Sequence, residues 1–148
     1  MKNNKKGFTL IELLVVISII GLLSTISVVA LNGARKKGRD AKRVGDIRQI
    51  QTALELYFND NYAYPISTAI ALGTAAGAKT ICTDGLEATC VESGDKTYMG
   101  IVPANPTPNG AAYTYTSDGA TYTITFTLEE ATGGYLVGAH TASPDGVS

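Results

Sequence analysis

The sequence predicts an α+β protein: a long N-terminal α-helical spine followed by a small C-terminal head that contains a three-stranded antiparallel β-meander. Three observations predict it. Residues 8–31 are almost entirely apolar, residues 44–58 carry apolar side chains at helical spacing, and residues 122–128 alternate strictly. The 148 residues, 45% of them apolar, suit one modest domain and exclude a large multidomain enzyme.

The spine begins with an apolar stretch of membrane-spanning length. Residues 8–31 contain 17 apolar side chains in 24 positions, and Glu12 is the single ionisable residue. A helix of this length extends about 36 Å at roughly 1.5 Å per residue, which exceeds a hydrocarbon core of about 30 Å. The short basic segment 1–7 ahead of it suits an N-terminus that is kept on the cytoplasmic side.

Three interpretations of this N-terminus compete. The first is a secretory signal with a small-residue cleavage site at Val28-Val29-Ala30, and the second is a simple single-pass anchor. Neither of these two interpretations explains Glu12. An unpaired ionised acid at membrane depth costs about 2–3 kcal/mol, and a signal or a simple anchor has no use for it. The third is a processing and assembly motif, in which Glu12 has a role.

Residues 5–17, Lys5-Lys6-Gly7-Phe8-Thr9-Leu10-Ile11-Glu12-Leu13-Leu14-Val15-Val16-Ile17, favour the third interpretation. They resemble the N-terminus of the type IV pilin superfamily, which includes the pseudopilins of type II secretion. The resemblance implies that a prepilin peptidase cuts between Gly7 and Phe8 and N-methylates Phe8. It also implies that Glu12 pairs with the Phe8 amine of an adjacent copy during filament growth. Such a buried pair would specify the axial register between subunits.

The residues support these roles independently of the resemblance. Gly7 has no side chain, so the backbone there is accessible to a protease. Glu12 lies within one helical turn of Phe8, where a carboxylate gains from the helix dipole and reaches free N–H groups. Glu12 can therefore also cap its own helix, which remains the alternative to pairing with a neighbouring copy.

The spine continues past the apolar stretch as an amphipathic helix. Its apolar positions form one stripe that is expected to pack against the head. These positions are Val44, Ile47, Ile50, Leu54, Tyr57 and Phe58. A single helix from Phe8 to about Asn59, roughly 78 Å long, should end near Asn59-Asp60-Asn61, ahead of Tyr64-Pro65. The expected parts are a leader (1–7), a membrane and filament-core helix (8–31), its amphipathic continuation (32–60), a connecting loop region (61–111) and the sheet with a C-terminal tail (112–148).

The charge distribution is strongly asymmetric. Residues 1–50 carry a net charge of +7 and residues 51–148 a net charge of −8. The basic residues between 35 and 48, Arg35, Lys36, Lys37, Arg39, Lys42, Arg43 and Arg48, are therefore expected to pair with the head of another copy. A nucleic-acid interface is the alternative, although no aromatic side chains interleave with the cluster.

The head offers a disulfide but no catalytic site. Cys82 and Cys90 are the only cysteines, and in an exported head they favour a disulfide. Two cysteines and the distant His140 do not make a zinc site. The acids Asp84, Glu87, Glu92 and Asp95 could bind a hard cation, but a solvated acidic surface is the preferred interpretation. No metal, no cofactor and no enzymatic activity are expected, because no nucleophile is paired with a base.

The sheet is predicted from alternation and turn residues. Tyr122–Leu128 alternates with threonines, Tyr113 and Tyr115 alternate before a Ser117-Asp118-Gly119 turn, and a third strand is expected around residues 134–139. Residues 65–79 and the proline-rich segment 102–110 are expected to be connections. This helix-then-meander order, together with residues 98–106, also resembles pilin and pseudopilin heads. The acidic calcium-binding loop of many secretion pseudopilins has no clear counterpart, since only Asp145 is acidic after Leu136.

The resemblance implies a structural subunit of a type IV pilus-like filament for adhesion, motility or DNA uptake. A type II secretion pseudopilin that forms a periplasmic piston is one alternative, and a non-polymerising membrane-tethered binding module is another. The implied partners are the prepilin peptidase, further copies of the chain, an inner-membrane assembly platform and the membrane itself. The precursor would span the cytoplasmic membrane with its head outside, and the assembled filament would be periplasmic or extracellular.

Overall fold

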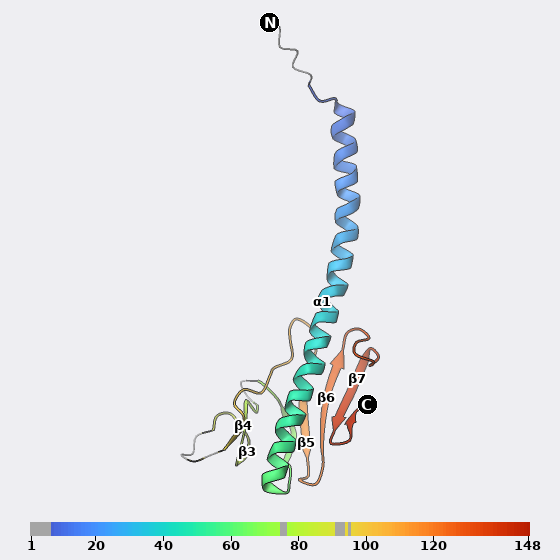
Figure 1. Ribbon diagram of the computed structural model, residues 1–148. Coiled ribbons are helices and arrows are strands. Elements are labelled where there is room, and N and C mark those ends of the chain that lie inside the picture. Colours follow the sequence, from blue (N-terminus) through green and yellow to red (C-terminus); the bar gives the residue numbers. More distant parts are fainter. Residues whose placement is uncertain (1–6, 75–76, 91–93, 95) are drawn as a thin grey trace. The chain divides into compact units, whose positions relative to one another are not determined.

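The computed structural model describes residues 7–74, 77–90, 94 and 96–148. The chain falls into two units, Met1–Arg35 and Lys36–Ser148, and helix α1 (Leu10–Asn61) contributes to both. The strands that follow are β1 (Ser67–Ala71), β2 (Thr80–Cys82), β3 (Gly85–Glu87), β4 (Thr97–Met99), β5 (Thr114–Ser117), β6 (Tyr122–Leu128), β7 (Gly138–Ser143) and β8 (Gly146–Val147) (Figure 1). The predicted α+β class is confirmed.

Helix α1 ends where the sequence predicts. Its last residue is Asn61, and the next residue, Tyr62, has a positive φ of 57°. The Tyr62 N–H donates to the Phe58 carbonyl oxygen at 2.7 Å, which satisfies one of the last free carbonyl groups of the helix. Pro65 then prevents further helix, because the residue before a proline, here Tyr64, disfavours the helical conformation.

The C-terminal half of α1 packs against the sheet of the second unit (Figure 1). The predicted apolar stripe is confirmed, because Val44, Ile47, Ile50, Leu54 and Tyr57 are buried and Phe58 is partly buried. Their partners in the core come mainly from the inner face of the sheet and include Tyr113, Tyr115, Tyr122, Ile124, Phe126, Leu128 and Ala142. Packing of the apolar stripe against the inner face of the sheet stabilises this half of the helix, in addition to the helix propensity of its residues.

The main sheet has the strand order β1-β5-β6-β7-β8 and is antiparallel throughout. Strand β6 alternates between buried and exposed side chains along its whole length, as predicted. The turn between β5 and β6 is also confirmed: the Asp118 carboxylate accepts hydrogen bonds from the backbone N–H groups of Ala120 and Thr121, each at 3.0 Å. These bonds hold the pKa of Asp118 below its ordinary value.

The predicted position of the third strand was wrong. Instead of residues 134–139, strand β7 covers Gly138–Ser143. Gly133 and Gly134 both have positive φ, and Thr132 and Tyr135 exchange two backbone hydrogen bonds of 3.0 Å across them. The segment is therefore a tight turn. The small residues of β7 carry little periodicity that could have shown where the strand begins.

Short strands also occupy the region expected to be a connecting loop, residues 61–111. Strand β1 extends the main sheet beside β5, and β2, β3 and β4 form a second sheet of three strands in the order β3-β2-β4. Backbone pairing forms these strands without a strict apolar alternation in the sequence. The proline-rich segment that follows β4 forms no helix or strand, as expected.

Candidate assembly site and head anchorage

The N-terminus of α1 is closed by a reciprocal pair of side chains, Thr9 and Glu12. The Glu12 carboxylate accepts hydrogen bonds from the Thr9 backbone N–H and the Thr9 hydroxyl, both at 2.7 Å. The Glu12 N–H donates back to the Thr9 hydroxyl oxygen at 3.3 Å. This arrangement is a capping box, which satisfies free donors at the first turn. The expectation that Glu12 reaches free N–H groups near the helix start is confirmed.

The predicted processing residues precede the helix. Gly7 and Phe8 lie before Leu10, where α1 begins, and the Phe8 side chain is 93% exposed. A Cβ added at Gly7 would meet nothing within 4 Å. The remaining residues of the predicted leader, including Lys2, Lys5 and Lys6, lie outside the described residues. Within the part of the chain that the structure describes, no basic side chain forms an ion pair with Glu12.

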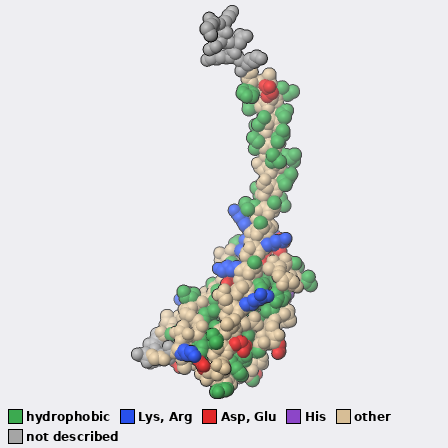
Figure 2. All heavy atoms as spheres, viewed as in Figure 1, with side chains coloured by type: hydrophobic (Ala, Val, Ile, Leu, Met, Phe, Trp, Pro, Cys, Tyr) green, Lys and Arg blue, Asp and Glu red, His purple; other side chains and the backbone are tan. Residues whose placement is uncertain are grey.

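The apolar half of α1 leaves its side chains exposed within the first unit. Leu10, Ile11, Leu22 and Val29, for example, are all more than half exposed. Helix α1 is long and apolar enough to cross a membrane by length and composition. Hydrophobic side chains cover this half in Figure 2, whereas Lys and Arg side chains gather along the middle of the helix. Such a surface requires lipid or other apolar helices around it.

In the second unit, a buried arginine joins α1 to two loops of the head. Arg43 is 0% exposed, and all five of its N–H donors have acceptors. It donates to the side chains of Asn105 (2.7 Å), Asp40 (2.5 Å) and Glu129 (2.8 Å) and to the carbonyl oxygens of Pro106 (3.3 Å) and Asn109. One side chain therefore fixes residues 105–109 and the end of β6 against the helix.

The acidic partners of Arg43 complete this network. The Asp40 carboxylate, itself fully buried, accepts from the backbone N–H groups of Glu129 (3.1 Å) and Glu130 (2.7 Å). Arg39 donates two parallel hydrogen bonds to the Glu129 carboxylate, one from Nε at 2.8 Å and one from Nη2 at 2.7 Å. The hydrogen bonds from Arg39, Asn109 and Arg43 together hold the pKa of Glu129 far below its ordinary value of 4.5, although desolvation opposes them.

The segment around Gly110 depends on the same network. Gly110 has a φ of +108°, and a Cβ there would lie 2.3 Å from the Asn105 amide nitrogen and 3.2 Å from Arg43. Only glycine fits both the backbone conformation and the available space.

Part of the charge-pairing hypothesis needs correction. Three of the seven basic residues between 35 and 48 pair within their own chain: Arg39 and Arg43 bind Glu129, and Lys36 lies 3.8 Å from Glu130. The acids of the β6–β7 loop approach the helix in the folded head, and no local sequence pattern shows that approach. The spacing Asp40-x-x-Arg43 was the available signal, because residues three apart share a helix face.

Sequence reasoning also missed a second buried acid on α1. Asp46 is 5% exposed and accepts a hydrogen bond from the Tyr113 hydroxyl at 3.1 Å. Burial raises the pKa of Asp46, and burial together with the nearby carboxylate raises the pKa of Tyr113. The pair connects α1 to the segment just before β5.

The lowered pKa of Glu129 predicts a stability loss in acid. Because the folded-state pKa lies below the ordinary value of 4.5, the stabilisation is complete above pH 4.5 and disappears as the pH falls below it. Urea unfolding at a series of pH values should therefore show a steeper acid loss in the natural chain than in Glu129→Gln. Equal acid slopes in the two proteins would contradict the assignment.

The predicted disulfide is present in the head. Cys82, at the end of β2, is joined to Cys90 with a Cα–Cα distance of 5.9 Å. Cys82 is fully buried, and Thr97 of the neighbouring strand β4 donates to the Cys90 sulfur at 3.6 Å. The bond closes a short loop that contains β3, an edge strand of the second sheet. Two members of the predicted acidic group, Glu92 and Asp95, lie outside the described residues.

Removing the disulfide should destabilise the head moderately. The double variant Cys82→Ser, Cys90→Ser is expected to lose about 2–3 kcal/mol of unfolding free energy, because the closed loop is short. Urea unfolding with and without reductant measures the loss. Reductant should shift the midpoint of the natural chain and leave that of the double variant unchanged. Two titratable thiols in protein purified without reductant would refute the bond.

The motif at Gly7–Glu12 and the order of one long helix before an antiparallel head define a class of protein. Residues 2–28 match the family described as "Prokaryotic N-terminal methylation motif". The chain is similar to "Type II secretion system core protein G" of Vibrio cholerae serotype O1, with 33% identity over 130 residues, 86% of this chain and 84% of that protein. The chain belongs to the superfamily of type IV pilins and type II secretion pseudopilins.

Other relatives match over a shorter segment. The protein of the same name from Escherichia coli K12 is 43% identical over 63 residues, which is 43% of each chain. The Aeromonas hydrophila protein is 42% identical over 64 residues, 45% of its length. The match thus spans less than half the length of these relatives. No solved structure gives a significant match to the chain.

Proposed function

We propose that this chain is a type II secretion pseudopilin, a non-catalytic subunit that polymerises through α1 into a short filament assisting protein export. The observation that carries the proposal is the similarity to the Vibrio cholerae core protein G across 86% of this chain, head included. The comparisons therefore favour the pseudopilin alternative over the pilus for adhesion, motility or DNA uptake. The processing motif makes a simple tether the weaker hypothesis.

The proposed cycle begins with the precursor in the cytoplasmic membrane. The apolar half of α1 spans the bilayer, the leader stays on the cytoplasmic side and the head is exported. A prepilin peptidase cuts between Gly7 and Phe8 and methylates the Phe8 amine. Loss of Lys2, Lys5 and Lys6 changes the net charge of the chain from −1 to −4.

An assembly platform in the inner membrane then transfers the subunit from lipid to a bundle of like helices. Each large apolar side chain is worth about 1.5–3 kcal/mol when fully removed from water, so the exposed surface of α1 must stay covered throughout. In the capping box, Glu12 is already bonded to Thr9. We propose that the Phe8 amine of a neighbouring copy adds a cation to this carboxylate and thereby fixes the axial register.

Mass spectrometry of the exported protein tests the processing step. The expected mature chain begins at a monomethylated Phe8, whereas any other first residue would contradict the proposed cleavage. Fractionation tests the type of filament. A pseudopilin should remain with the cell envelope after shearing and restore secretion to a strain that lacks its own core protein G. Abundant protein in the sheared fraction without restored secretion would favour a pilus.

A further inference from the structure

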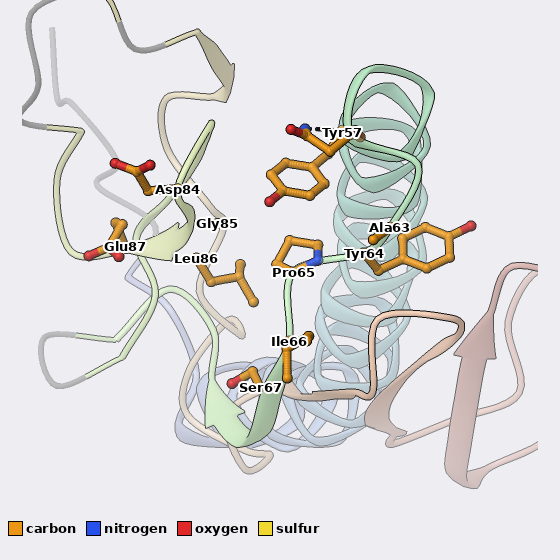
Figure 3. A pocket seen from close by; sticks show the side chains of 11 residues that line it. Tyr57, Ala63, Tyr64, Pro65, Ile66, Ser67, Asp84, Gly85, Leu86 and Glu87 are labelled. Atoms are coloured by element: carbon orange, nitrogen blue, oxygen red, sulfur yellow. Dashed lines mark hydrogen bonds between the residues drawn. The ribbon is translucent and has the colours of Figure 1, made fainter.

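The head contains a cleft that the assembly function described above does not use. It has a volume of about 460 Å³ and lies between the end of α1, the segment 63–67 and the β2–β3 hairpin. Tyr57, Pro65 and Leu86 form apolar walls, and Asp84 and Glu87 lie on the hairpin side (Figure 3). All of its residues belong to the second unit. We call it the hairpin cleft.

The positions of these walls are fixed by contacts within the head. The Tyr57 hydroxyl donates to the Thr83 carbonyl oxygen at 3.2 Å, which holds the hairpin near the helix. Gly85 is buried, and a Cβ there would lie 3.4 Å from the Cβ of Pro65. Burial raises the pKa of Tyr57, and the nearby Tyr98 and Asp84 add to the increase. The cleft is therefore a formed feature rather than a gap between mobile segments.

The cleft suits a long cationic side chain. Within the described part of the chain, neither Asp84 nor Glu87 takes part in an ion pair, and both are exposed. Lysine and arginine place their aliphatic carbons along apolar surface while the charged end stays near water and anions. Apolar walls beside two carboxylates match that combination. Ile66, 78% exposed at the same cleft, adds apolar surface for a partner.

The chain itself carries cations of this kind on α1. Lys37 and Lys42 are exposed and make no ion pair within the described residues, unlike Lys36, Arg39 and Arg43. We call these two residues the stem cations. Lys37 lies about 30 Å from Tyr57 along the helix axis and Lys42 about 22 Å, at 1.5 Å per residue. Neither can reach the cleft of its own chain.

We propose that the hairpin cleft receives a stem cation from a second copy of the chain, displaced by about 20–30 Å along the helix axis. The inference rests on the proposed function, because only a filament places copies in parallel with a regular offset. Without residues 1–7, residues 8–50 carry a net charge of +4 and residues 51–148 a net charge of −8, and these opposite charges favour the same contact. An exposed ion pair supplies mainly orientation and specificity, so the contact would align heads while the apolar helices hold the filament together.

Zero-length cross-linking tests the contact in the natural full-length chain. A carbodiimide joins a carboxylate directly to an amine, so assembled filaments made from mixed heavy-isotope and light copies should yield Asp84 or Glu87 linked to Lys37 or Lys42 of the other isotope. The Lys36–Glu130 pair provides the same-chain control. Filaments that give the control product but no mixed-isotope link at the cleft would overturn the proposal and leave the filament function intact.

Charge reversal gives an independent measurement. Asp84→Lys with Glu87→Lys in one chain, or Lys37→Glu with Lys42→Glu in another, should each lower filament yield several-fold, and mixing the two variants should restore it. The matched controls are Asp145→Lys in the head and Arg48→Glu on α1, which change exposed charges outside the cleft and outside the pair Lys37 and Lys42, and both should assemble normally. Unchanged yield in the cleft variants, or a cleft cross-linked to a different protein, would reject the second copy as occupant. Absence of filaments from the natural chain would overturn both proposals.

Discussion

Replacing Arg43 with methionine should lower the unfolding free energy of the head by about 3–5 kcal/mol, the range for breaking a buried ion pair by removing one partner. The side chain is 0% exposed, so its loss leaves the buried Asp40 and the largely buried Glu129 without their shared cation. It also frees the carbonyl groups of Pro106 and Asn109. Urea unfolding of the full-length chain in detergent measures the loss.

Two comparisons isolate the cause of that loss. Lys42→Met removes an exposed cation from the same helix and should change stability by no more than about 0.5 kcal/mol. Arg43→Lys keeps the charge but offers three donors instead of five, so it should recover only part of the loss. If Arg43→Met and Lys42→Met were equally stable, the buried network would not anchor the head.

Replacing Glu12 with alanine should abolish filament growth while leaving membrane insertion and cleavage at Gly7 largely intact. The side chain has two separable roles, because it caps its own helix through Thr9 and supplies the charge proposed to meet a neighbouring Phe8 amine. The alanine variant removes both. The growth defect is measured as filament yield from cells that contain normal amounts of mature subunit. Because the alanine variant removes both roles at once, further variants are needed to separate them.

Glu12→Gln and Thr9→Val separate the two roles. Glutamine serves as well as glutamate at the third position of a capping box, so Glu12→Gln keeps the cap and removes the charge. Thr9→Val keeps the charge and removes the hydroxyl. If register depends on charge, Glu12→Gln should fail to assemble and Thr9→Val should grow. The opposite pattern would assign Glu12 to helix capping alone.

Local patterns predicted much of this fold. The stripe from Val44 to Phe58 repeats with the period of a helix, and β6 repeats with the period of a strand, so neighbouring residues alone indicate which face is buried. The apolar run of residues 8–31 is recognised by its length and continuity instead. The motif around Gly7 and Glu12 is equally local, because its residues lie within one turn of the helix start. The cysteine pair was predicted from composition and compartment and lies only 8 residues apart.

The sequence by itself thus determined the spine, its N-terminal methylation motif and the central hairpin of the head, since each depends on residues close together along the chain. Only the tertiary structure decided that Arg43 binds Glu129, which lies 86 positions further along the chain. The same holds for the start of β7 at Gly138 and for the cleft between the end of α1 and the β2–β3 hairpin. These features arise where distant segments meet as the core forms, and the pairing of one loop with another leaves no period in the sequence. The ion pairs of Lys36, Arg39 and Arg43 with Glu129 and Glu130 also depend on the tertiary structure. The sequence shows the charges of these residues but not the distances between them.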